Sequence, residues 1–156
     1  MDKKARAKQV YELFKQDLTN SKIKYEPHDD DLVISMTVHG EDLPQPTLIM
    51  VDEDREVVRL ISPLPSKIPE DKRMEAAVAV ATANYGLVNG SFDYDMSDGE
   101  IRYRVCQSYA GTVLNEETVR YLLGVIFFTT DKYNDLFFML GKGMISLEDF
   151  LKKEQE

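Results

Sequence analysis

Residues 84–104, Asn-Tyr-Gly-Leu-Val-Asn-Gly-Ser-Phe-Asp-Tyr-Asp-Met-Ser-Asp-Gly-Glu-Ile-Arg-Tyr-Arg, contain the strongest structural signal in the chain. The signal is the dipeptide Asp98-Gly99, which is typical of a two-residue type I′ turn between antiparallel strands. That turn predicts a register in which Asp95 faces Arg102 and Asp93 faces Arg104. Because side chains alternate along a strand, the opposite face is predicted to be apolar and to carry Phe92, Tyr94, Met96, Ile101, Tyr103 and Val105.

The same segment resembles the start of a calcium-binding EF-hand loop, because Asp93, Asp95 and Ser97 alternate before an Asp-Gly pair. Such a loop needs glycine at its sixth position and a bidentate glutamate at its twelfth. Here Asp98 occupies the sixth position and Arg104 the twelfth, so both requirements fail. We therefore expect the carboxylates to be paired with arginines and predict no metal at this segment.

Signatures of catalysis are absent from the rest of the sequence. The two histidines, His28 and His39, are not spaced as paired metal ligands, and we expect His28 and the adjacent residues 29–31 to form a solvated loop. Cys106 is predicted to share a strand face with Arg102 and Arg104, but we expect it to be a small strand residue rather than a reactive thiol. No nucleotide-binding or α/β-hydrolase motif occurs. The sequence predicts no catalytic residue, cofactor or metal, although triads assembled from distant residues stay open.

Periodic patterns on the N-terminal side of the hairpin predict a helix and three strands. Apolar residues at Val10, Leu13, Phe14 and Leu18 follow the spacing of one helical face. Alternation over residues 32–39 indicates a half-buried strand, while the apolar runs 47–51 and 57–61 are joined by polar residues as a second hairpin. Three antiparallel strands are therefore expected after the first helix.

Two further helices and a short tail helix flank the central hairpin. One starts near Pro69, ends at Asn89-Gly90 and is predicted to use a face formed by Met74, Ala77, Val78, Ala81 and Tyr85. Asn115 is the expected N-cap of a long helix that ends at Gly141 and Gly143, and Ser146 caps a short helix through Lys153. The predicted fold is α+β, an antiparallel sheet with helices in the order α-β-β-β-α-β-β-α plus a short C-terminal helix, in one domain over residues 1–156.

Composition narrows the classes of partner. The 156 residues are 43% hydrophobic and carry a net charge of −9, which opposes binding to the phosphates of nucleic acid. The longest apolar run, residues 124–128, is far shorter than the about 20 residues that cross a bilayer. The basic N-terminus lacks the apolar segment of a signal peptide, and the single cysteine excludes an internal disulfide. We expect a cytoplasmic protein that binds neither nucleic acid nor membrane.

The long helix has more apolar residues than one buried face requires. Tyr121, Val125, Phe128 and Met139 lie away from its main stripe and form a second, interrupted one. A second stripe needs a second partner. Either the tail helix covers it, through Ile145, Leu147, Phe150 and Leu151, or it forms a subunit interface or a peptide-binding groove.

A family resemblance points to protein binding. The element order, small size and acidic charge resemble the type III secretion chaperone fold, and several core and turn patterns resemble the YbjN family over roughly residues 8–141. These patterns are Val51-Asp52 before a charged turn, Ser62-Pro63-Leu64-Pro65, Ala83-Asn84-Tyr85 at the end of an alanine-rich helix, and Gly90-Ser91-Phe92 with the Asp-Gly hairpin. The resemblance implies a homodimer that binds protein clients in a bacterial cytoplasm, without a cofactor.

Two functional hypotheses follow from the sequence. The leading one is a noncatalytic, chaperone-like or regulatory protein- or peptide-binding module, for which the second apolar stripe of the long helix supplies the candidate partner-binding residues. Its physical basis is that an antiparallel sheet with a free edge can accept an added strand and that apolar patches hold client side chains. The alternative is a small metal-dependent hydrolase or ligand-sensing domain that uses the acidic loops 29–31 and 52–54.

Overall fold

The computed structural model describes residues 1–41 and 43–156. Within them the elements are α1 (Lys3–Asn20), β1 (Glu26–His28), β2 (Val33–His39), β3 (Pro44–Asp52), β4 (Val57–Pro63), the 3-10 helix η1 (Glu70–Lys72), α2 (Arg73–Tyr85), β5 (Ser91–Asp95), β6 (Glu100–Ser108), α3 (Glu116–Gly141) and α4 (Leu147–Glu154). No helix in this part of the chain is long and apolar enough to cross a membrane.

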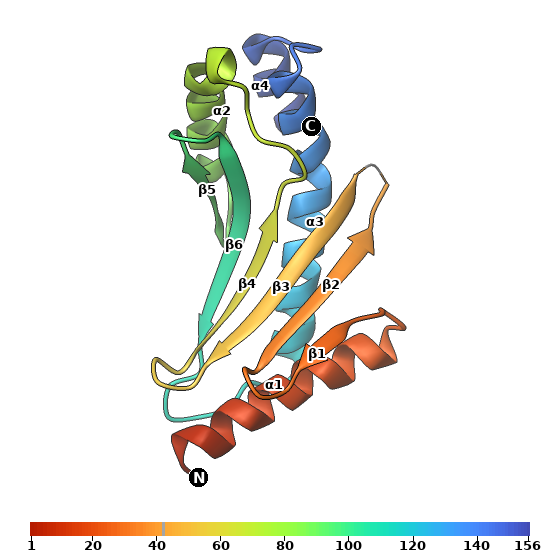
Figure 1. Cartoon of the computed structure of the whole chain (residues 1–156), viewed down its shortest axis with the longest axis vertical. Helices are drawn as coiled ribbons and strands as arrows, with labels where there is room; N and C mark the ends of the chain where they lie inside the picture. Colours follow the sequence, from red (N-terminus) through yellow and green to blue (C-terminus); the bar gives the residue numbers. More distant parts are fainter. Residues whose placement is uncertain (42) are drawn as a thin grey trace.

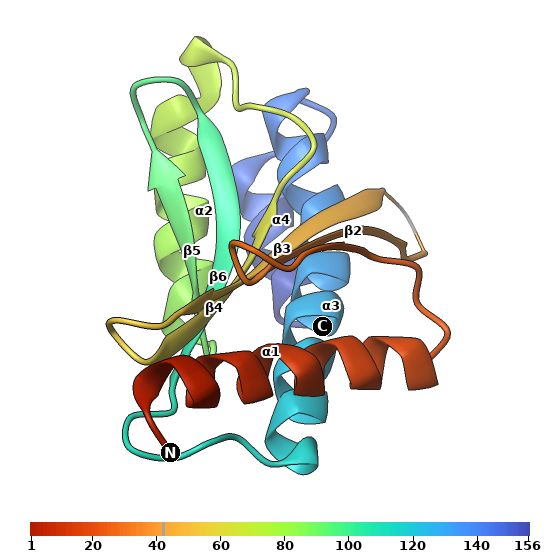
Figure 2. The same ribbon diagram turned by 60° about the horizontal axis from the view of Figure 1, so that its bottom comes forward.

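The strands form one twisted antiparallel sheet in the order β1-β2-β3-β4-β6-β5 (Figure 1). Helix α3 packs behind β3, β4 and β6, and α1 crosses α3 on the same side of the sheet (Figure 2). Helix α2 packs against β5, and α4 contacts both α2 and α3. The predicted α+β fold and its antiparallel sheet are confirmed, and within residues 1–41 and 43–156 the opposite face of the sheet carries no helix.

Strand β1 was not predicted, so four strands rather than three follow α1. It has only three residues, Glu26 to His28, and all of them are exposed. Pro27 also lacks the N–H of a ladder donor and is common at sheet edges. A strand this short and polar shows no apolar alternation, which explains why the sequence pattern did not reveal it.

Helices α1, α3 and α4 begin at side-chain caps, whereas α2 follows η1 without one. Asp2 accepts a hydrogen bond from the Ala5 N–H, and Asn115 accepts one from the Thr118 N–H at 2.8 Å. Ser146 forms a capping box with Asp149. The predicted caps at Asn115 and Ser146 are therefore confirmed, and each satisfies N–H groups that have no partner inside the helix.

The central hairpin is confirmed, but its predicted register is wrong by two residues. Asp95 faces Glu100 rather than Arg102, and Asp93 faces Arg102 rather than Arg104. The cause is a four-residue loop in which the Asp95 carboxylate accepts hydrogen bonds from the Ser97 N–H and hydroxyl, at 2.9 and 2.6 Å. Because a shift of two residues preserves which face a side chain occupies, the predicted separation into a charged and an apolar face survives.

Helix α2 buries the face opposite to the predicted one. Met74, Val78 and Tyr85 are 73%, 48% and 94% exposed, whereas the buried residues are Ala76, Ala79, Val80 and Ala83. The small buried side chains let α2 approach β5 closely, and the Asn84 side chain bonds to the backbone of Phe92 there. The helix also ends at Tyr85, earlier than predicted, and Gly90 instead adopts a left-handed φ of 74° just before β5.

An aromatic cluster fills the core between the hairpin and the last two helices. Phe92 lies 5.1 Å from the rings of Tyr103 and Tyr133 and 5.3 Å from that of Phe137. Phe150 of α4 completes the cluster, with its ring 5.0 Å from that of Phe137. The tail helix is therefore part of the core at the C-terminal end of α3.

Candidate binding surfaces

The face of the sheet that no helix covers, toward the viewer in Figure 1, is the largest candidate surface. We call it the open sheet face. Alternation along the strands places on it Val33, Ser35, Thr37, Pro46, Leu48, Met50, Val57, Arg59, Ile61, Pro63, Arg102, Arg104 and Cys106. Its middle is apolar: Leu48 is 36% exposed, and Ile61 is 6% exposed although it faces away from the helices. An uncovered apolar patch with a polar rim is typical of a protein-binding surface.

A hollow of about 500 Å³ lies on this face near β1. Its lining includes Tyr25, Ser35, Thr37, Pro46, Leu48 and Pro63. These side chains come from the segment before β1 and from β2, β3 and β4, so the hollow exists only because the sheet brings those strands together. Its apolar walls can hold a hydrophobic side chain of a partner, but they carry no arrangement of groups suited to catalysis.

Two arginines on the open sheet face share one carboxylate. The Asp93 carboxylate accepts hydrogen bonds from Arg104 Nε at 2.8 Å, Arg104 Nη2 at 3.1 Å and Arg102 Nε at 3.1 Å. The bonds from Arg104, and then those from Arg102, lower the pKa of Asp93, while the same contact raises the pKa of Arg104. Asp93 therefore stays ionised and paired, which makes it a poor acid or base.

A third arginine on this face has no such partner. Arg59 lies between Met50 and Cys106 in the sheet register and is half-buried. Within the described residues it makes no hydrogen bond or ion pair, although its charge contributes a small part of the lowered pKa of Asp52. A half-buried guanidinium with unused donors is a potential anion-binding group.

Helical surfaces supply two smaller apolar patches. In the second apolar stripe of the long helix, which we call the α3 stripe, Tyr121 and Phe128 are 51% and 75% exposed, whereas Val125 and Met139 are half-buried against the core. Helix α4 leaves Tyr121 and Phe128 open, so its position does not account for the whole stripe. The second patch, which we call the α2 stripe, consists of Met74, Val78 and Tyr85 on α2 and Val88 shortly after it, and includes side chains that are 94% and 98% exposed. Sequence reasoning missed it, because Met74, Val78 and Tyr85 were predicted to form the packing face of the helix.

The free edges of the sheet are poorly suited to accept another strand. At β5, the Asn84 amide donates to the Phe92 carbonyl at 3.0 Å and accepts from the Phe92 N–H at 2.7 Å, so it occupies the groups that an added strand would use. At the other edge β1 is only three residues long and contains Pro27. Short edges with proline resist strand addition. A bound segment is therefore more easily accommodated on the open sheet face than at an edge.

The two acidic loops of the alternative hypothesis do lie near each other. Residues 29–31 and Glu53 line one hollow of about 660 Å³, together with Lys4, Lys8 and Tyr11. Asp29 is engaged, however: the Tyr11 hydroxyl donates to it at 2.8 Å and Lys15 at 3.1 Å, and both bonds lower its pKa.

The carboxylates of the second acidic loop are also held by neighbouring groups. Asp52 accepts hydrogen bonds from Arg55, of which the backbone N–H bond contributes most to its lowered pKa. Over residues 1–41 and 43–156, no group of three or more His, Cys, Asp or Glu side chains could hold a metal ion. The arrangement does not favour a metal-dependent reaction.

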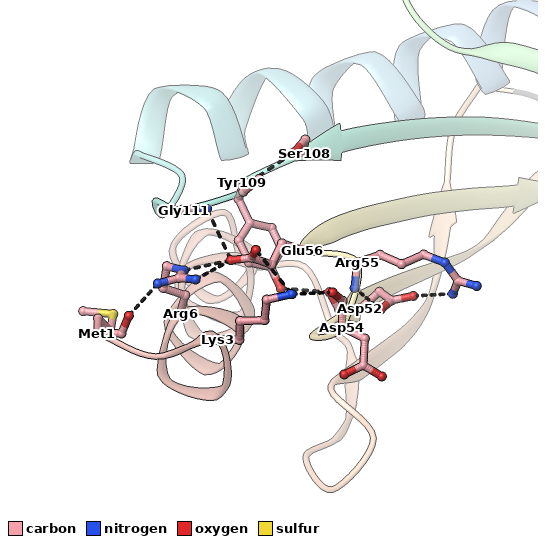
Figure 3. A network of polar contacts seen from close by, with 11 residues as sticks. Met1, Lys3, Arg6, Asp52, Asp54, Arg55, Glu56, Ser108, Tyr109 and Gly111 are labelled. Atoms are coloured by element: carbon pink, nitrogen blue, oxygen red, sulfur yellow. Dashed lines mark hydrogen bonds and ion pairs between the residues drawn. The ribbon is translucent and has the colours of Figure 1, made fainter.

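A polar network at Glu56 fixes the base of the molecule (Figure 3). Arg6 donates to Glu56 Oε1 through Nε at 2.9 Å and Nη2 at 2.6 Å, and the Gly111 N–H donates to the same oxygen at 3.3 Å. The bonds from Arg6 are the main reason that the pKa of Glu56 is lowered. The network joins the start of α1, the β3–β4 turn and the loop before α3, and its groups satisfy one another, so we assign it a structural role.

Sequence comparisons do not place the chain in a family. No protein-family model matches it. No curated protein matches it either.

Solved structures share the fold. A complex of ExsC with ExsE superposes with a TM-score of 0.58 at 14% identity, over 87% of this chain and 96% of the other. YbjN from E. coli gives a TM-score of 0.58 at 9% identity, over 77% and 84% of the two chains. The HopA1–SchA chaperone–effector complex gives 0.50 at 16% identity, over 75% and 91%. The chain therefore has the fold seen in YbjN and in type III secretion chaperone complexes.

Proposed function

We propose that this protein is a noncatalytic, chaperone-like module that binds an extended segment of a client protein on its open sheet face, in a bacterial cytoplasm. The observation that carries the proposal is the exposed Leu48 at the apolar middle of this face, next to a hollow large enough for client side chains. Likeness of fold to a chaperone–effector complex supports it. The blocked edge at β5 favours binding through side chains on the face over strand addition.

The two helical stripes are proposed as further contact surfaces. The α2 stripe, which is the more exposed, would be buried between two copies in a homodimer. The α3 stripe, with Tyr121, Val125, Phe128 and Met139, would contact a partner protein beyond the sheet. Several exposed apolar side chains along one face of a helix are unusual for a monomer, because their burial contributes about 25 cal/mol per Å².

Oligomeric state tests the first of these assignments. We expect a dimer by light scattering at micromolar concentration and a monomer of unchanged melting temperature after Val78→Glu. The control variant Gln9→Glu adds the same charge at an exposed position of α1, outside both stripes, and should remain dimeric. A wild-type monomer at these concentrations contradicts the dimer, and so does a Val78→Glu protein that remains dimeric.

Site-specific photo-crosslinking tests the binding function. A photoreactive amino acid is placed at Leu48 on the open sheet face and, as a matched control, at Gln9 on the exposed side of α1. We expect one defined client to be crosslinked from position 48. Excess unlabelled wild-type protein should reduce the amount of this crosslinked product, whereas Leu48→Glu protein should not. Equal, non-competed products from both positions would contradict a binding site on this face.

A further inference from the structure

A straight row of side chains crosses the open sheet face. Leu48 on β3, Ile61 on β4 and Arg104 on β6 are successive cross-strand partners in the sheet register. Neighbouring strands lie about 4.8 Å apart, so two strand spacings separate Leu48 from Arg104 by about 10 Å. Because the hollow adjoins Leu48, the row leads from an apolar anchoring site to a guanidinium group.

Positive charge is in excess at the arginine end of this row. Arg59, Arg102 and Arg104 stand against two carboxylates here, namely Asp93, which pairs with Arg102 and Arg104, and Asp52, whose pKa the charge of Arg59 helps to lower. The other carboxylates on this face lie at its margins, namely Glu26 on β1, and Asp95 and Glu100 at the hairpin. The whole chain carries a charge of −9, so this patch is a local exception that favours an anionic group.

The distance along the row sets the spacing in a partner. An extended segment of the polyproline II type rises about 3.1 Å per residue and repeats every three residues. Side chains three positions apart therefore point to the same side and lie about 9 Å apart, which matches the separation of Leu48 and Arg104. In an ideal strand, side chains three positions apart point to opposite sides.

We propose that the client segment carries a large apolar residue and an acidic residue three positions apart, the first seated at the Leu48 hollow and the second bound by Arg59 and Arg104. This inference rests on the proposed function and specifies its ligand. Arg59 supplies unused donors. Arg104 is 37% exposed, and its Nη1 group, which donates only to the weak acceptor Cys106 Sγ at 3.5 Å, can turn to a carboxylate. The apolar contact supplies most of the binding energy, and the carboxylate supplies selectivity and register.

Peptide titrations followed by NMR amide shifts test the proposal. Twelve-residue Gly/Ser peptides carry Leu and Glu three positions apart, in both orders, and control peptides separate them by six positions or replace Glu with Gln. We expect one order of the three-spaced peptide to shift the amides of Leu48, Ile61 and Arg104. We also expect about tenfold weaker binding of the Gln peptide, because bonds to a charged acceptor are the stronger ones.

Protein variants locate the carboxylate. Arg59→Gln and Arg104→Gln should each weaken binding of the Glu peptide severalfold and leave that of the Gln peptide unchanged. Arg120→Gln, on an exposed part of α3, should change neither. Raising the salt concentration should weaken binding of the Glu peptide and leave binding of the Gln peptide unchanged.

Other outcomes separate the inference from the proposed function. If Glu and Gln peptides bind equally and Leu48→Ser weakens both, the face binds apolar segments and the acidic requirement is wrong. If no peptide shifts the amides of this face at millimolar concentration, the ligand assignment is overturned, while crosslinking from position 48 still decides the function. If Arg59→Glu dissociates a dimer, a second copy occupies the face and the client assignment is wrong.

Discussion

Neutralising Asp93 together with each of its two arginines should reveal unequal coupling energies that follow the number of hydrogen bonds each arginine donates. Arg104 donates two hydrogen bonds to Asp93, at 2.8 and 3.1 Å, and Arg102 donates one at 3.1 Å. The side chains of Asp93 and Arg104 are 28% and 37% exposed, so solvent screens each bond and a cross-strand pair contributes about 0.2–1 kcal/mol. We expect a coupling of about 1 kcal/mol for Asp93 with Arg104 and about half of that for Asp93 with Arg102.

The assay is a pair of double-mutant cycles in urea unfolding, with Asp93→Asn combined with Arg104→Gln or Arg102→Gln. A third cycle, Asp95→Asn with Arg102→Gln, is the control, because those residues would face each other only in the two-residue turn register. That cycle should give no measurable coupling, since Asp95 is engaged in its own turn and faces Glu100. A larger coupling for Asp95 with Arg102 than for either Asp93 pair would refute the structural register.

The same pair has a defined pH dependence. The arginines lower the pKa of Asp93 in the folded protein below its unfolded value near 3.9. The stabilisation is therefore complete above the unfolded pKa and is lost as the pH falls through the folded pKa. Couplings measured at pH 7 and pH 5 should agree, and the coupling should decline only below about pH 4.

Two further substitutions test how the core and the hairpin loop are built. Phe150→Ala should destabilise the protein by about 3–4 kcal/mol in urea unfolding, because it removes a fully buried ring from the aromatic cluster. Leu151→Ala, at a half-buried position of the same helix, should cost only about 1–2 kcal/mol. Equal effects of the two substitutions would mean that α4 is not part of the core. Gly99→Ala should cost about 2 kcal/mol or more, since φ is 83° and a Cβ would clash with the carbonyl oxygen of Ile68; a neutral change in unfolding free energy would exclude this loop conformation.

Periodicity was sufficient to predict the fold class, and local side-chain chemistry explains where details differed. Asp98-Gly99 indicated a hairpin correctly, but turn length was set by the Asp95 carboxylate, which bonds to Ser97 and extends the loop. In α2, both faces contain apolar residues, and only the partner surface decides which is buried. Close approach to β5 selected the alanine face over the face with Met74.

The candidate site was less predictable than the fold. A usable signal existed in β3, where the apolar residues Leu48 and Met50 alternate with the core-facing residues. This pattern indicates a strand that is apolar on both faces. The row from Leu48 to Arg104 depends on sheet order, because β4 pairs with β6 rather than with β5. Neither sequence spacing nor charge patterning contains that information.

Alkylation of Cys106 with and without client tests the central claim most directly. This residue is the sole cysteine of the chain, is exposed, and lies on the open sheet face beside Arg59, so the wild-type protein carries its own reporter. At a saturating concentration of the client identified by crosslinking, we expect the thiol to be alkylated at least tenfold more slowly than in the free protein. A control cysteine at Gln9, in a Cys106→Ser background, should react at the same rate with and without client. An unchanged rate at Cys106 in the saturated complex would contradict binding on this face.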